Sequence, residues 1–279
     1  MNPLIDRHTT LKEFHMSRLR ILAAALTAGA LFTPAAHAIQ VKVTITSLAP
    51  SQGVEFTPVW VGFHDGDFDT YDLGAAASAD LERLAEDGNT APITAAFSAA
   101  GYTQQATLQG TAIDGPRFEP GDSTSFIFEL DGNDPDNRYI SFLSMVLPSN
   151  DAFFGNANPV GHSIFNEDGS FDGEDFIVTG SLVRDAGTEI NDEIAANTAR
   201  LGQSTPNTGV DQFGVVSAHA GFIPGGDILT AFPNADFTQA GYQVARIQVT
   251  AVPEPETYAM LLAGLGLVGF RAARTRRRV

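Results

Sequence analysis

Acidic side chains crowd three short segments of the sequence, and crowded carboxylates are chemically suited to bind a cation. The segments are residues 64–72, 166–175 and 185–193. Closely spaced carboxylates repel one another unless water or a cation lies between them, and Ca²⁺ takes about six to eight oxygen ligands from loops of this kind. Calcium binding is therefore the first chemistry that the sequence points to.

The second of these segments matches half of an EF-hand calcium loop. Asp168, Ser170, Asp172 and Gly173 fit the positions at which such a loop carries its first oxygen ligands and its turn glycine. The last position requires a bidentate glutamate, however, and this chain has Thr179 there. We therefore predict a solvated hairpin turn in this segment and no metal.

No motif for nucleophilic or metal-dependent catalysis points to an enzyme. The sequence has no G-x-S-x-G, no H-E-x-x-H, no P-loop and no cysteine. His64, His162 and His219 lack the spacing of metal ligands, so we interpret them as structural or exposed histidines. The catalytic alternative is a polysaccharide-active protein in which two acids, such as Asp65 and Asp185, act as general acid and base.

The charge distribution excludes one class of partner. The 279 residues carry a formal net charge of −17, and residues 39–252 hold 29 acidic residues against 7 basic ones. Such a surface repels phosphate backbones, so we predict that the protein does not bind nucleic acid. The absence of cysteine also means that no disulfide can rigidify the fold.

Alternation of apolar and polar residues predicts β-strands throughout residues 39–252. Clusters of Gly, Pro, Asn and Asp separate the strands and predict turns. Two short helices are predicted, at 78–86 and, more weakly, at 190–201. We therefore expect an all-β fold, an antiparallel β-sandwich with one or two short helices. The predicted strands are residues 40–46, 58–64, 123–130, 139–147, 175–183 and 241–251.

Several aromatic residues of these strands are expected in the core and not on a binding surface. The strand at 139–147 is so apolar that we expect it to be buried on both faces. The aromatic residues expected in the core are Trp60, Phe63, Phe126, Phe128 and Phe142.

The amino-terminal region, residues 1–38, predicts an export signal. Basic residues precede an apolar run at 21–32 and the small-residue pattern A-H-A, which is typical of a Sec-type signal peptide. The internal Met16 fits better than Met1 as the start of this signal. We expect the mature chain to begin at Ile39.

The carboxyl-terminal region, residues 253–279, has three parts in order. A P-E-P motif precedes an apolar stretch at 258–270 and a cluster of arginines. As a helix the stretch would cover about 20 Å, which is less than the roughly 30 Å hydrocarbon core of a bilayer. The tail resembles a PEP-CTERM sorting signal, which implies transient anchoring in the inner membrane and handling by an exosortase, a membrane transpeptidase.

Three separated motifs in residues 39–252 resemble the spondin domain, the amino-terminal module of the matrix protein F-spondin, in its bacterial form. The resemblance implies a β-sandwich, a link to extracellular-matrix adhesion, and a calcium ion bound near loops at one end. The motifs are TPVWVGFHDGDFDTYDLG with the residues that follow it, SMVLPSNDAFFG and LVRDAGTEINDE.

The same resemblance implies a set of metal ligands. The family's P-S-x-D motif places Asp151, and its D-A-G-T-acid motif places Asp185 and Glu189, together with the backbone carbonyl of Leu182. One departure is that Ala152 follows the first motif where the family usually has an aromatic residue. The alternative is a purely structural role, in which these acids cap turns of their own backbone and bind no metal.

Together these observations predict an exported, non-enzymatic, calcium-binding adhesion or matrix module at the cell envelope or surface. We expect three regions: a signal peptide region at 1–38, a spondin-like domain at 39–252 and a sorting segment at 253–279. The expected partners are an exosortase-type enzyme and components of the extracellular matrix or exopolysaccharide, for example in a biofilm. The alternative is a polysaccharide-binding or polysaccharide-active protein of the exopolysaccharide matrix.

Overall fold

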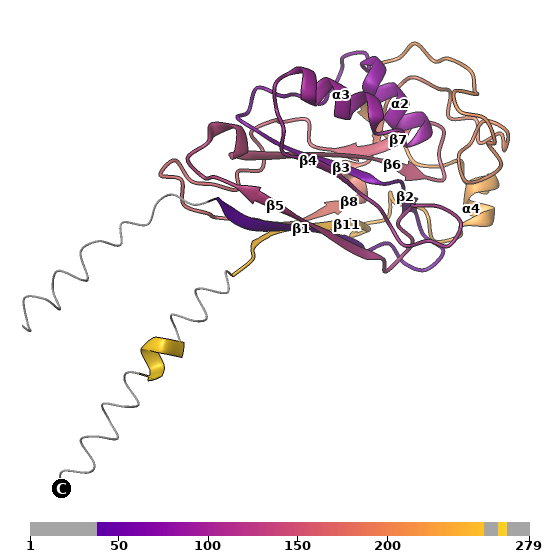
Figure 1. Ribbon diagram of the computed structural model, residues 1–279. Coiled ribbons are helices and arrows are strands. Elements are labelled where there is room, and N and C mark those ends of the chain that lie inside the picture. Colours follow the sequence, from indigo (N-terminus) through magenta and orange to yellow (C-terminus); the bar gives the residue numbers. More distant parts are fainter. Residues whose placement is uncertain (1–37, 254–261, 267–279) are drawn as a thin grey trace, which may run out of the picture. The chain divides into compact units, whose positions relative to one another are not determined.

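Two antiparallel β-sheets face each other in the computed structural model of the protein, which describes residues 38–253 and 262–266 (Figure 1). The fold is mostly β with a few short helices, as the sequence predicts. The predicted signal peptide and most of the apolar stretch at 258–270 lie outside the described residues. Among the residues that are described, no helix has both the length and the apolar character needed to cross a bilayer.

The first sheet has four strands, and the two ends of the domain meet in its centre. Its inner face is apolar because Val41, Val43 and Ile45 alternate along β1 and are fully buried. The strands β1 and β11 pair so that Val41 lies opposite Ala251, and the chain therefore enters and leaves this sheet at the same end of two adjacent central strands (Figure 1). In spatial order the strands are β5 (Ser123–Leu130), β1 (Ile39–Ser47), β11 (Gln243–Ala251) and β8 (Glu174–Thr179).

The second sheet has seven strands, and its central strands are buried on both faces. Strand β6 carries no exposed residue, as its apolar sequence predicts. In spatial order the strands are β10 (Ser217–Ala218), β9 (Arg184–Asp185), β7 (Ala152–Gly155), β6 (Tyr139–Leu147), β3 (Val59–His64) and β4 (Gln105–Leu108), and β2 (Glu55–Phe56) pairs with β6.

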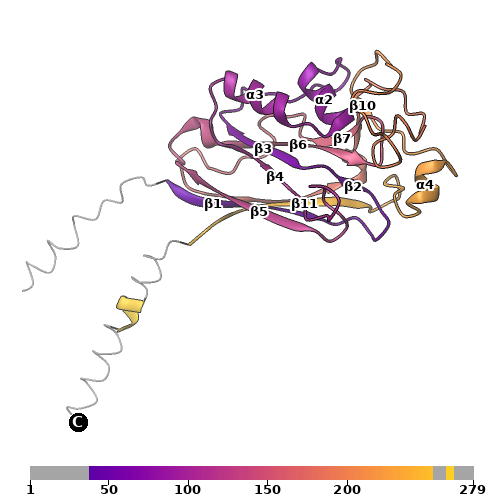
Figure 2. The same ribbon diagram turned by 45° about the vertical axis from the view of Figure 1, so that its right-hand side comes forward.

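Two helices, α2 (Ala79–Asp87) and α3 (Ala91–Ala99), cover the outer face of the second sheet (Figures 1 and 2). They form a second core in which the ring centroids of Trp60 and Phe97 lie 5.2 Å apart. Gly62 faces this layer, and a Cβ atom there would come within 2.8 Å of the Phe97 ring. The close approach of α3 to the sheet therefore depends on a glycine.

Helix α2 begins and ends at recognisable caps. The side chain of Ser78 accepts a hydrogen bond from the N–H of Leu81, and Gly88 ends the helix in the left-handed conformation. Leu81 and Leu84 are fully buried against the sheet. Within residues 38–253 the remaining short elements are the 3-10 helices η1 (Pro135–Asn137) and η2 (Gly180–Leu182) and the helix α4 (Asp227–Ala231).

Most strands match their predicted ranges, but three expectations were wrong. Residues 190–201 form turns because side chains such as that of Asp192 bond to nearby backbone and compete with helical hydrogen bonds. The strand predicted at 175–183 ends at Thr179, where η2 begins. Phe126 is 47% exposed because β5 is an edge strand, whereas the other aromatic residues expected in the core are buried.

A buried ion-pair network joins β2 to two loops. The carboxylate of Glu55 contacts the guanidinium groups of Arg117 at 2.6 Å and of Arg200 at 2.8 Å. Arg117 also pairs with Asp114 and Glu119 at 2.5 Å. The side chains of Glu55 and Arg117 are more than nine-tenths buried, so the network cross-links segments far apart in sequence without a disulfide.

Candidate functional site

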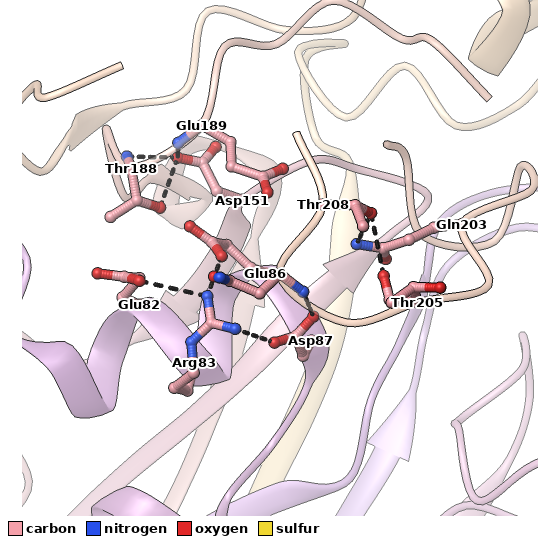
Figure 3. Close-up of polar contacts among 11 residues, drawn as sticks. Glu82, Arg83, Glu86, Asp87, Asp151, Thr188, Glu189, Gln203, Thr205 and Thr208 are labelled. Atoms are coloured by element: carbon pink, nitrogen blue, oxygen red, sulfur yellow. Dashed lines mark hydrogen bonds and ion pairs between the residues drawn. The ribbon is translucent and has the colours of Figure 1, made fainter. Parts of the chain in front are cut away.

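Asp151 lies in the turn between β6 and β7, and its side chain holds the loop at 186–193 in place. Its Oδ2 atom accepts hydrogen bonds from the N–H groups of Thr188 at 2.8 Å and Glu189 at 3.1 Å (Figure 3). The Thr188 hydroxyl donates a third bond to the same oxygen. The other oxygen, Oδ1, is buried and has no hydrogen-bond partner among the described residues. One half of this carboxylate is therefore free to bind another group.

Asp185 reaches the same place from the neighbouring strand. Strands β7 and β9 pair so that Ala152, the residue after Asp151, lies opposite Asp185. The carboxylate of Asp185 accepts hydrogen bonds from the N–H of Gly187 at 2.7 Å and from the Asn191 side chain at 2.8 Å. Burial, followed by the negative charge of Asp185, raises the pKa of Asp151 to about 6.

Glu189 adds a second buried carboxylate. Its side chain is 3% exposed, and its Oε2 atom has no hydrogen-bond partner among the described residues. Burial, together with the negative charges of Glu86 and Asp151, raises the pKa of Glu189 to about 8. Buried carboxylates that resist ionisation in this way favour a proton or a metal cation beside them.

The three predicted ligands are linked through Asp151 but do not form a finished metal site. In the part of the chain that the structure describes, no group of three or more His, Cys, Asp or Glu side chains is arranged to hold a metal ion. Leu182 ends η2, three residues before Asp185, and its side chain is 39% exposed. The assignment of these residues as calcium ligands therefore stays a prediction.

Helix α2 contributes acidic residues that sequence reasoning did not place at the site. The guanidinium of Arg83 pairs with the carboxylates of Glu82 at 3.3 Å, Asp87 at 2.5 Å and Glu86 (Figure 3). Glu86 is only 3% exposed, and burial raises its pKa. The sequence predicted the helix, but it held no signal that a distant loop would cover this carboxylate.

Asp65, one of the two acids of the catalytic alternative, lies in an environment that does not suit a proton donor. The carboxylate of Asp65 accepts hydrogen bonds from the hydroxyl of Tyr102 at 2.5 Å and from the N–H of Asp67 at 3.0 Å. The bond from Tyr102 is the main cause that lowers the pKa of Asp65. A general acid needs a raised pKa. The environment of Asp65 therefore gives no support to a role as proton donor.

His64 is a structural residue. Its Nδ1 atom accepts a hydrogen bond from the N–H of Gly66, so Nε2 carries the proton and donates to the Ser141 hydroxyl at 2.8 Å. The ring is fully buried, and burial lowers its pKa to about 4. His162 stacks on Phe176 with ring centroids 3.9 Å apart. Both agree with the structural interpretation.

The segment that half-matches an EF-hand loop is a hairpin turn, as predicted. The N–H of Asn166 donates to the carbonyl of Ser170, and Phe165 and Phe171 form an antiparallel bridge across the turn. The side chain of Asp168 caps the turn by accepting bonds from Ser170. The carboxylate of Asp168 is therefore satisfied within the turn itself.

Comparison with protein-family models assigns two parts of the chain. Residues 42–161 match the Spondin_N model, and residues 251–278 match the PEP-CTERM protein-sorting motif. A comparison with curated proteins found no match. Asp151 lies inside the Spondin_N match, whereas Asp185 and Glu189 lie beyond its end.

These two matches carry functional meaning. Spondin_N domains are typically non-catalytic. A PEP-CTERM motif implies export and processing by an exosortase, and it indicates sorting to the cell surface. The recognised motifs around Asp151 and at the carboxyl-terminal tail agree with both matches. The chain therefore carries a Spondin_N domain at residues 42–161 and a PEP-CTERM sorting motif at residues 251–278, and the sorting motif implies export.

Proposed function

We propose that the protein is a non-catalytic adhesion or matrix module of the cell envelope, stabilised by a bound calcium ion. One observation carries the calcium part of the proposal. The Oδ1 atom of Asp151 is fully buried, has no hydrogen-bond partner among the described residues, and belongs to a carboxylate coupled to both Asp185 and Glu189. A buried anion of this kind is costly unless a cation compensates it.

The residues present fit calcium better than other common metals. The donors would be the carboxylates of Asp151, Asp185 and Glu189 and the carbonyl of Leu182, all of them oxygens. Calcium accepts oxygen ligands in flexible arrangements, whereas magnesium requires a strict octahedron and holds its waters tightly. The described residues supply no cysteine, and no histidine belongs to the proposed donor set, which disfavours zinc and copper.

The proposed ion has a structural role because its site is buried. Asp151 and Glu189 are 0% and 3% exposed, so a ligand from solution would not reach an ion held between them directly. The ion would instead supply positive charge that fixes the loop at 186–193 against the turn before β7. Because the protein has no disulfides, this metal-mediated contact between the loop and the turn would keep the surface loops ordered outside the cell.

The proposed partners follow from the sorting motif and the surface. An exosortase would process the tail, and matrix proteins or exopolysaccharide would contact the exported domain. The strongly acidic character of residues 39–252 supports binding through calcium bridges or hydrogen bonds and not through attraction to anionic polymers.

Calcium is expected to stabilise the purified protein against heat. One ion bound only by the folded state adds RT ln(1 + [Ca²⁺]/Kd), which is about 2.7 kcal/mol at a hundredfold excess over Kd. For a domain of this size, that corresponds to a rise in melting temperature of about 5–10 °C. Differential scanning calorimetry with calcium, with magnesium and with chelator measures the effect, and magnesium should do less.

Two variants locate the response. Asp185→Asn should abolish the calcium-dependent rise, whereas Asp172→Asn should leave it intact, because Asp172 is exposed in the region of the hairpin. A wild-type melting curve that chelation leaves unmoved would reject the calcium proposal. Control of the response by Asp172 would reject the site.

The sorting proposal is tested in the native host. Replacement of Pro253-Glu254-Pro255 by alanines should leave an unprocessed protein that accumulates in the inner membrane, because the exosortase would no longer recognise its motif. Cell fractionation and intact-mass measurement of the recovered protein distinguish the two forms. If the variant is processed to the same extent as the wild type and reaches the same location, the tail has no role in sorting.

A further inference from the structure

A cavity of about 470 Å³ lies between an edge strand of the first sheet and an edge strand of the second. Its walls include Thr179, the last residue of β8, and Ala218 and His219 in and after β10. The turn at 237–242, which leads into β11, forms a third wall. None of the predicted calcium ligands is among the described residues that line it. Its volume lies within the range of about 300–1,000 Å³ that is usual for small-molecule sites.

The walls of this cavity carry no charged side chain, although the domain is strongly acidic. Residues 39–252 hold 29 acidic residues, yet the described residues that line the cavity include no Asp, Glu, Lys or Arg. An ionic ligand would have to leave water here without a charged partner, which is costly. The net negative charge of the domain also repels anions. The cavity therefore suits a neutral ligand.

Polar groups of the walls can donate and accept hydrogen bonds. The hydroxyls of Thr179 and Ser181 bond to each other at 2.8 Å, which leaves one of their protons and several lone pairs for a ligand. The side-chain amide of Gln239 donates to Asp236, and the carbonyl oxygen of the same side chain remains an acceptor. Because a hydroxyl group both donates and accepts, mixed walls of this kind suit a ligand with many hydroxyl groups.

His219 adds a buried donor that lacks an acceptor. Its Nδ1 atom accepts a hydrogen bond from the N–H of Gly221 at 3.0 Å, so Nε2 carries the proton of the neutral ring. Burial lowers the pKa of His219, which keeps the ring neutral. The residue is 9% exposed, and its Nε2 atom has no hydrogen-bond partner within the described part of the chain. An unpaired buried donor is costly, so a ligand oxygen that reaches this wall would be bound favourably.

Apolar surface lies beside these polar groups. The side chains of Val183, Phe237 and Tyr242 also line the cavity. The rings of His219 and Phe237 pack edge to face with their centroids 5.3 Å apart, so the histidine is held in place by its neighbours. A wall that is already ordered lowers the entropy cost of binding. A ligand for this cavity should therefore present both hydroxyl groups and apolar C–H surface, as a sugar ring does.

We propose that the cavity binds one neutral hexopyranose residue of a matrix polysaccharide. The hydroxyl groups of the sugar would bond to the wall residues, and one of its oxygens would accept the proton of His219 Nε2. The inference rests on the proposed matrix function and deepens it, because it names the class of ligand and the place of contact. It also gives the buried histidine a partner.

The test compares neutral sugars with their acids in the purified protein. The probes are the methyl glycosides of glucose, galactose and mannose, each paired with its uronic acid, in which a carboxylate replaces the hydroxymethyl group. Titration calorimetry and saturation-transfer NMR measure binding. At least one neutral sugar should bind with a Kd of about 1–10 mM, which is typical for so small a ligand. Its uronic acid should bind at least about tenfold more weakly, because the walls offer no cation.

Three variants locate the sugar. His219→Phe keeps an aromatic ring but removes the donor, and it should weaken binding at least about tenfold. Ala240→Trp places a large side chain at an exposed wall position and should abolish binding. Ala95→Trp, at an exposed position on α3, is the matched control and should leave the affinity unchanged. Thermal unfolding establishes that all three are folded. In the wild type, the nitrogen NMR resonance of His219 Nε2 should shift when the sugar binds, which a merely structural histidine would not show.

Each contrary result has a distinct meaning. If the wild type binds none of the neutral sugars, or binds their acids more tightly, the inference is wrong. If Ala240→Trp binds sugar as the wild type does, the sugar lies elsewhere and the assignment of the cavity is wrong. The proposed function is tested separately, by adhesion of the exported protein to the matrix of its native host. Adhesion that is absent in the wild type rejects that function, whereas adhesion by a wild type that binds no hexose rejects only the sugar site.

Discussion

Arg117→Met is expected to lower the free energy of unfolding by about 3 kcal/mol. The substitution removes the guanidinium that contacts Glu55, Asp114 and Glu119, and it leaves the carboxylate of Glu55 buried with Arg200 as its remaining partner. A buried charge that loses a partner costs far more than an exposed one. Urea denaturation monitored by circular dichroism measures the loss.

The double variant Glu55→Met/Arg117→Met is the control. It removes both charges and fills their space with apolar atoms, so its stability should return close to that of the wild type. A single variant that loses less than about 1 kcal/mol would show that the network contributes no more than a surface ion pair. The cross-linking role described for these residues would then be wrong.

In chelator, the protein is expected to lose about 4 kcal/mol of stability at the buried acidic site as the pH rises from 5 to 9. The pKa of Glu189 rises from 4.5 to about 8 on folding. A group whose pKa is raised by folding contributes stability that is present below its unfolded pKa and is lost as the pH rises through its folded pKa. Deprotonation of Glu189, which becomes harder on folding, therefore weakens the metal-free fold in this window.

Two comparisons isolate this contribution. Glu189→Gln removes the titrating group, so the difference in unfolding free energy between wild type and variant should grow with pH. Saturating calcium should flatten the wild-type profile, because the ion replaces the proton. His64 acts in the opposite direction, since its lowered pKa of about 4 costs stability as the pH falls below 6.5. If the unfolding free energy of the wild type in chelator does not change between pH 5 and 9, the raised pKa assigned to Glu189 is wrong.

The strands could be predicted because their signal is local. Strands β1, β5 and β6 match their predicted ranges within one residue at either end, since alternation or continuous apolar sequence depends only on neighbouring residues. Helix α3 was missed because almost all of its residues are apolar or small, so it lacks an amphipathic pattern. Its burial against Trp60 is a tertiary contact.

The site was predictable only in part. The motifs around Asp151 and Asp185 were recognisable, but their meeting depends on the pairing of β7 with β9, which no periodicity reveals. The placement of Glu86 requires that the loop at 186–193 cover helix α2. A contact between two segments about a hundred residues apart cannot be predicted from the sequence pattern of either segment alone.

The position of β11 also decides how the domain bears tension. The sorting segment follows directly from Ala251, the last residue of a strand that lies between β1 and β8 and is antiparallel to both. A pull on the tail therefore enters the fold along the axis of a central strand. If the far end of the domain holds a partner, the hydrogen bonds on both sides of β11 are loaded together in shear. A surface protein tethered in this way resists detachment with two ladders at once, whereas a tether on an edge strand such as β5 would load only one.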